Sequence, residues 1–170
     1  MKKIILSVLA IAMALSITAC GAGNIGADGK PIESSQASSE ESKAPAPEKT
    51  KDLKGMQEYM KWAEYLSGDP KEMQGGFIGA KDGGVKYQFK YENSDVTVEL
   101  YEFDKNALND TAKEVIESVK STGKFTMLGQ DVEAVLSDNE KYLMIYRDGS
   151  TDEKNVARKD EVLKFFKSYE

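Results

Sequence analysis

The clearest pattern in this sequence is the alternation of apolar and polar residues in the middle of the chain. Lysine and glutamine separate four apolar residues, as in a strand with one buried face: Val85, Tyr87, Phe89 and Tyr91. The turn-forming residues 92–95 follow, and alternation then resumes from Val96 towards Phe103. Together, the two runs predict a β-hairpin.

Three other segments repeat apolar residues at intervals of three and four, which is the period of a helix. The first predicted helix covers residues 53–66 and stops at the Ser-Gly-Asp-Pro sequence that follows. The second has Asn109 or Asp110 as its N-cap and ends at Gly123, a residue suited to a left-handed C-terminal position. The third predicted helix repeats four apolar positions near the end of the sequence: Val162, Phe165, Phe166 and Tyr169.

Shorter apolar runs complete the pattern. Residues 125–128 and 132–136 predict strands separated by a turn, and the uninterrupted apolar run 142–146 predicts a central strand. The glycine-rich segment 75–80 is expected to contain a short strand.

The order of the predicted elements indicates an α+β fold. Strands joined by hairpins form antiparallel sheets, and helices with a single apolar stripe pack against them. We therefore expect an antiparallel sheet of about five to six strands, with helices mainly on one face, in a single domain over residues 51–170. The order also suggests two similar ββα units, roughly 84–121 and 130–169.

The first residues of the chain have a different pattern. Lys2 and Lys3 precede 16 uncharged residues, 4–19, which is a suitable length for the apolar core of a secretory signal peptide. This run ends in Ile17-Thr18-Ala19-Cys20, which resembles the lipobox of bacterial lipoproteins. The resemblance implies that residues 1–19 are a signal peptide, that cleavage falls between Ala19 and Cys20, and that the Cys20 thiol carries a diacylglyceryl group.

Further acylation, for example with palmitate, is in keeping with the same class, because two or more acyl chains hold a protein stably in a membrane. An ordinary signal peptide or an uncut anchor helix is the alternative. The resemblance ends at about residue 21. The whole chain is similar to small lipoproteins of Gram-positive bacteria, and no characterised family is implied for the domain.

Residues 20–50 form the predicted connection between anchor and domain. Serine, glutamate, alanine and proline dominate this segment, and the first aromatic residue of the chain is Tyr59. Such a composition cannot bury enough apolar surface to offset the entropy of ordering, so we expect a disordered linker.

Composition limits the candidate partners and chemistry. The chain has 23 Lys and Arg against 29 Asp and Glu, a net charge of −6, which disfavours nucleic acid as a partner. It has no histidine and one cysteine, Cys20. Catalytic triads, cysteine nucleophiles, and zinc or iron sites are therefore excluded, and we expect no cofactor and no metal.

Two carboxylate-rich loops and a set of tyrosines are the remaining candidates for a site. The segment from Asp104 to Asp110 begins like a calcium loop, but Asn109 and Val115 stand where glycine and glutamate are needed. Residues 148–153 could also gather oxygen ligands. We interpret both segments as solvated loops and helix caps. Five tyrosines lie on predicted strands: Tyr87, Tyr91, Tyr101, Tyr142 and Tyr146. They could form a sheet face that binds sugars or peptides, but we favour a core role for them.

These observations favour a lipoprotein anchored through Cys20 on the outer face of the cell membrane, with an extracytoplasmic domain that binds a protein, glycan or small ligand without catalysis. One alternative is a small carboxylate-based enzyme acting on a cell-surface glycan. The other is an accessory subunit of a membrane complex. The sequence identifies no catalytic or ligand-binding residue in the domain.

Overall fold

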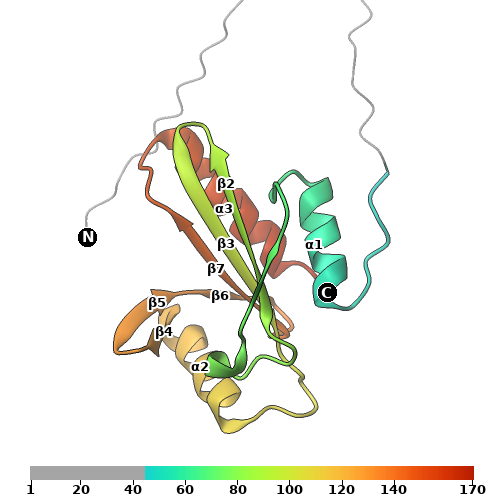
Figure 1. Cartoon of the computed structure of the whole chain (residues 1–170), viewed down its shortest axis with the longest axis vertical. Coiled ribbons are helices and arrows are strands. Elements are labelled where there is room, and N and C mark those ends of the chain that lie inside the picture. The colour runs from blue at the N-terminus through green and yellow to red at the C-terminus, as the bar shows by residue number, and fades with distance from the viewer. Residues whose placement is uncertain (1–44) are drawn as a thin grey trace, which may run out of the picture. The chain divides into compact units, whose positions relative to one another are not determined.

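A computed structural model gives the structure of the chain and describes residues 45–170 (Figure 1). A five-stranded antiparallel sheet has the order β1-β2-β3-β7-β6. Its strands are β1 (Lys71–Met73), β2 (Gly84–Tyr91), β3 (Ser94–Glu102), β7 (Tyr142–Asp148) and β6 (Val135–Leu136). A separate hairpin pairs β4 (Lys124–Met127) with β5 (Gln130–Glu133). The helices are α1 (Leu53–Trp62), the 3-10 turn η1 (Gly76–Ile78), α2 (Asp110–Thr122) and α3 (Glu153–Lys167).

The two faces of the sheet carry separate hydrophobic cores. Val98 and Leu100 of β3 point into the first core, which α1 and α3 cover, whereas Tyr101 points into the second, which α2 and the β4–β5 hairpin cover. The side chains of β7 enter both cores, which explains why its sequence is apolar without alternation. The predicted α+β fold with an antiparallel sheet is confirmed, and two of the three α-helices within residues 45–170 share one face.

The position of α2 contradicts the suggestion of two similar ββα units. Equivalent units in one sheet would place α2 and α3 on the same face. Instead Ile116 of α2 belongs to the second core and Phe166 of α3 to the first. The helix itself is as predicted, because the Asn109 side chain accepts a hydrogen bond from the Ala112 N–H at 2.8 Å and Gly123 has φ +72°.

The glycine-rich segment and the end of α1 also differ from prediction. Residues 76–78 form the 3-10 turn η1, and the short strand of this region is β1. The first helix ends at Trp62 because the N–H groups of Glu64 and Tyr65 donate to the carbonyls of Lys61 and Met60, at 2.9 Å each. Glu64 adopts φ +65°, so this is a helix end in which a left-handed residue closes the last turn.

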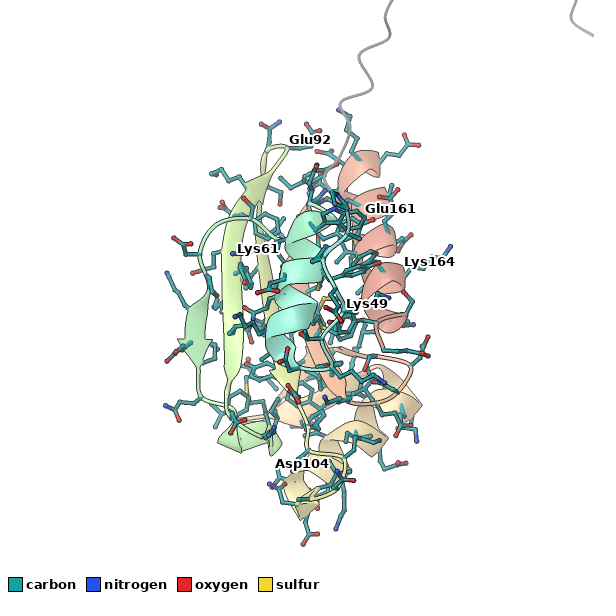
Figure 2. All side chains as sticks on the ribbon, turned by 90° about the vertical axis from the view of Figure 1, so that its right-hand side faces the viewer. Lys49, Lys61, Glu92, Asp104, Glu161 and Lys164 are labelled. Atoms are coloured by element: carbon teal, nitrogen blue, oxygen red, sulfur yellow. The ribbon has the colours of Figure 1, made fainter. Side chains whose placement is uncertain are left out.

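The chain just before α1 is fixed to the domain at several points. The Tyr169 hydroxyl donates to the Thr50 carbonyl at 2.6 Å, and the Lys49 ammonium lies 4.7 Å from the centre of the Tyr59 ring. Figure 2 shows Lys49 between α1 and α3. Asp52 caps α1, and the hydrogen bond from the Gly55 N–H, followed by that from Thr50, lowers the pKa of its carboxyl group.

Candidate functional site

A groove between β5, β7 and α3 is the candidate site. It consists of two hollows of about 540 and 290 Å³, which share the lining residues Glu133, Tyr146 and Lys159. The larger hollow lies between β5 and the end of β7, and the smaller one extends to Leu163 of α3 and to the end of α2. We call these two hollows together the β5–β7 groove.

The groove exists because β5 turns away from β7. Val135 and Leu136 of β6 pair with Met144 and Leu143 of β7. Residues 130–133 pair instead with β4, and between the two strands the Ala134 N–H donates to the Gly123 carbonyl at 3.0 Å. Figure 1 shows the β4–β5 hairpin diverging from the upper part of β7. The second half of β7 is therefore an edge of the sheet.

The backbone of this edge faces the groove. The Tyr142 N–H and C=O both point to the β6 side, where they bond the Ser137 hydroxyl and the Ser137 N–H. Backbone groups alternate in direction along an antiparallel strand, so those of Tyr146 and Asp148 point the same way. No residue in the range 45–170 forms a backbone hydrogen bond with these groups of Tyr146 and Asp148 on that side.

Tyr146 also contributes an unusual side chain. It is only 6% exposed and lines both hollows, and its hydroxyl has no hydrogen-bond partner within the described part of the chain. Burial, together with the negative charge of Asp148, raises the pKa of this hydroxyl, which keeps it protonated at neutral pH. The hydroxyl oxygen itself is fully buried in the first core, so a ligand in the groove does not reach it.

A buried carboxylate lies on the other face of the sheet. Glu99 is 5% exposed and lies 3.0 Å from Arg147 Nη1 and 3.6 Å from Lys86 Nζ. The Tyr101 hydroxyl donates to it at 3.1 Å, and burial and the Glu99 charge raise the pKa of Tyr101. Two cations and a hydroxyl thus satisfy Glu99, and this cluster fixes Arg147 on one side of β7.

A larger hollow, of about 750 Å³, lies beside the start of α1 and is lined partly by the backbones of Gly75, Gly83 and Gly84. Its carboxylate, Glu102, accepts a hydrogen bond from the Leu53 N–H at 2.8 Å and pairs with Lys141 at 3.1 Å. One oxygen therefore attaches the start of α1 to the sheet and the other pairs with Lys141, so we assign Glu102 a structural role.

The two carboxylate-rich loops act as caps and turns in the structure. Asp104 accepts a hydrogen bond from the Asn106 N–H at 3.0 Å, and Asp110 is exposed and pairs with Lys113 at 3.0 Å. Asp148 accepts from Asn155 at 2.8 Å, from Ser94 and from the Ser150 N–H. Within residues 45–170, no three His, Cys, Asp or Glu residues are grouped so that they could hold a metal ion.

The five strand tyrosines are divided between core and surface. Tyr87, Tyr101, Tyr142 and Tyr146 are buried, and Tyr91 is half-buried. They do not form an exposed aromatic face, so a core role fits the first four. Sequence reasoning placed Tyr146 in the core but gave no signal for its unpartnered hydroxyl. Ala19 and Cys20 lie outside the described residues.

Comparisons with known proteins identify no relative. No family model, no curated protein and no solved structure matches the chain. Among the helices of residues 45–170, none combines the length and the apolar character that crossing a membrane requires.

Proposed function

We propose that this chain is a lipoprotein held on the outer face of a bacterial membrane through Cys20, and that its domain is a non-catalytic binding module. The observation that carries the anchor is the lipobox-like sequence Ile17-Thr18-Ala19-Cys20 after an uncharged run of 16 residues. In this proposal the membrane lipid is attached covalently, which suits an acidic protein that gains no electrostatic attraction to anionic lipid.

Three groups of the domain with shifted pKa values, Glu140, Tyr87 and Asp148, are poorly suited to acid–base catalysis. A general acid or base works best with a pKa near the operating pH. Hydrogen bonds from Lys120 and Lys105 lower the pKa of Glu140, and burial raises that of Tyr87 to about 12. Each of these shifts moves the group further from neutrality. The same is true of Asp148, because hydrogen bonds from Asn155, Ser94 and the Ser150 N–H outweigh its burial and lower its pKa.

The β5–β7 groove supports a binding role. It combines a strand edge whose backbone groups have no backbone partner among residues 45–170 with charged side chains of both signs, among them Lys159 and Glu133. Such features recognise a partner through hydrogen bonds and require no reactive group.

Intact-mass measurement on the membrane fraction of the native host tests the anchor. We expect the wild-type mass to show loss of residues 1–19 and gain of acyl chains, and Cys20→Ala to be unprocessed or released. Ser16→Ala, which leaves the four lipobox positions unchanged, is the matched control and should behave like the wild type. An unlipidated wild-type protein would refute the anchor, and hydrolysis of cell-wall glycans at enzymatic rates would refute the non-catalytic role.

A further inference from the structure

We propose that residues 47–51 are a strap that opens and closes on the outer side of α1 and α3 as a unit of its own, while the helices and the sheet stay folded. In the lipoprotein proposed above, opening of the strap lengthens the tether between the anchor and the domain. That consequence for the tether rests on the proposed anchor at Cys20, whereas the strap itself does not.

The contacts of the strap join it to both helical elements of the first core. The Thr50 carbonyl accepts a hydrogen bond from the Tyr169 hydroxyl at 2.6 Å. The Lys49 ammonium lies 4.7 Å from the centre of the Tyr59 ring and 5.5 Å from that of the Tyr169 ring, and Figure 2 shows it between α1 and α3. Pro47 is half-buried. The closed strap therefore bridges α1 and the end of the chain.

The surface under the strap is aromatic. The Tyr59 ring of α1 stacks on Phe165 of α3 with 4.8 Å between centroids, and it lies 5.7 Å from the Tyr169 ring. Tyr59 and Phe165 are half-buried, whereas Tyr169 is 1% exposed. Aromatic faces attract a cation such as the Lys49 ammonium. The occupant of this aromatic surface is thus a segment of the chain itself.

The strap is attached more weakly than the elements it covers. Residues 48–51 are exposed, and residues 47–51 belong to no helix or strand. The hydrogen bond from the Lys141 ammonium to the Lys51 carbonyl is also at the surface. A segment with few buried apolar contacts and exposed hydrogen bonds opens locally at a lower free energy than the core unfolds. The strap is such a segment.

A hinge at Asp52 limits the opening. The Asp52 carboxylate caps α1 by accepting from the Gly55 N–H at 2.7 Å, and the Leu53 N–H donates to Glu102 of β3 at 2.8 Å. Neither bond involves residues 47–51, so the start of α1 stays capped and attached to the sheet when the strap opens. Five residues then join the tether, and their full stretch is about 17 Å.

Gly55 shows how closely the strap approaches α1. A Cβ atom at this position would lie 2.6 Å from the Thr50 carbonyl oxygen and 2.9 Å from the Tyr169 hydroxyl oxygen, and closer still to the Thr50 hydroxyl oxygen. Alanine is a better helix former than glycine, so Gly55→Ala suits α1 itself. The substitution therefore displaces the closed strap and leaves the helix intact.

The test times the cleavage of the Lys49–Thr50 bond by trypsin in the full chain, isolated in detergent micelles, and identifies the products by mass spectrometry. A synthetic peptide of residues 45–56 gives the rate without a strap. We expect the chain to be cut at least tenfold more slowly than the peptide. Low urea should change this rate little, because opening exposes little surface, whereas cleavage within α3 should rise steeply.

Two variants identify the contacts that close the strap. Gly55→Ala should raise the rate of cleavage after Lys49 tenfold or more. Tyr169→Phe, which removes only the hydroxyl that bonds Thr50, should raise it about threefold or more. Gly76→Ala is the matched control, because no atom lies within 4 Å of a Cβ built there, and it should be cut like the wild type.

Three results would overturn the strap. The first is cleavage of the wild-type chain after Lys49 at the rate of the peptide. The second is cleavage there with the same steep urea dependence as in α3, which would mean that the segment opens only when the domain unfolds. The third is a Gly55→Ala variant cut no faster than Gly76→Ala. The intact mass of the same sample reports the lipid, and an unlipidated chain would remove the tether consequence while the strap stands.

Discussion

Gly84 of β2 gives the sharpest stability prediction, because the structure leaves no room for a side chain there. A Cβ atom at this position would lie 2.3 and 2.4 Å from the Cδ1 and Cε1 atoms of Tyr101 and 2.9 Å from the Leu100 carbonyl oxygen. Tyr101 is the cross-strand partner of Gly84, and its ring covers the glycine. In the Gly84→Ala variant the Tyr101 ring must therefore move.

The cost of that movement follows from the surroundings of Tyr101. Ordinary contact begins at 3.4 Å, so the ring has to withdraw by about 1 Å. It is fully buried, packs edge-on against Phe77, and donates a hydrogen bond to Glu99 at 3.1 Å. Overpacking a core costs about 1–3 kcal/mol. Losing a hydrogen bond to a buried carboxylate adds about 1–3 kcal/mol. We expect Gly84→Ala to lower the free energy of unfolding by about 3 kcal/mol.

Urea denaturation followed by the fluorescence of Trp62, the single tryptophan, measures this change. In a thermal melt the same loss corresponds to a fall in Tm of roughly 10 °C. Gly76→Ala is the matched control, because no atom lies within 4 Å of a Cβ built there, and it should change stability by less than about 0.5 kcal/mol.

A second variant separates the clash from other effects. In a Tyr101→Ala background the obstructing ring is gone, so adding Gly84→Ala should cost much less than in the wild type. The reasoning is refuted if Gly84→Ala is as stable as Gly76→Ala, or if its full cost persists when the Tyr101 ring is absent.

Three further variants test other parts of the fold. Asn109→Ala removes the cap of α2 and should destabilise the domain by about 1 kcal/mol in urea, whereas an unchanged midpoint would contradict the cap assignment. The pKa of Asp148 is lowered in the folded state, so the stability that its carboxylate contributes is present above its unfolded pKa and is lost as pH falls through its folded pKa. Asp148→Asn should therefore be less stable than the wild type at pH 7 and should lose less stability below about pH 4. Parallel curves of stability against pH would contradict this. Asparagine tolerates a positive φ better than leucine, so Leu128→Asn should stabilise the chain by about 0.5 kcal/mol in thermal melts. An unchanged Tm would contradict backbone strain at Leu128.

The sequence alone determined the elements whose signals are local. The β2–β3 hairpin follows from alternation at a period of two, and α2 follows from its apolar stripe, the Asn109 cap and Gly123. Both signals depend only on neighbours along the chain. The run from Tyr142 to Tyr146 could be recognised as a central strand because a strand buried on both faces contains no polar alternation.

The tertiary structure alone decided which face each helix covers and where the sheet has an open edge. An apolar stripe requires burial but does not specify against which face, so α2 and α3 could be separated only by their contacts in the two cores. The β5–β7 groove depends on β5 pairing with β4 instead of β7, a choice between distant partners that residues 130–136 do not encode locally. The sequence identifies Tyr146 only as a core residue. The positions of its neighbours in the fold are needed to show that its hydroxyl has no hydrogen-bond partner among residues 45–170.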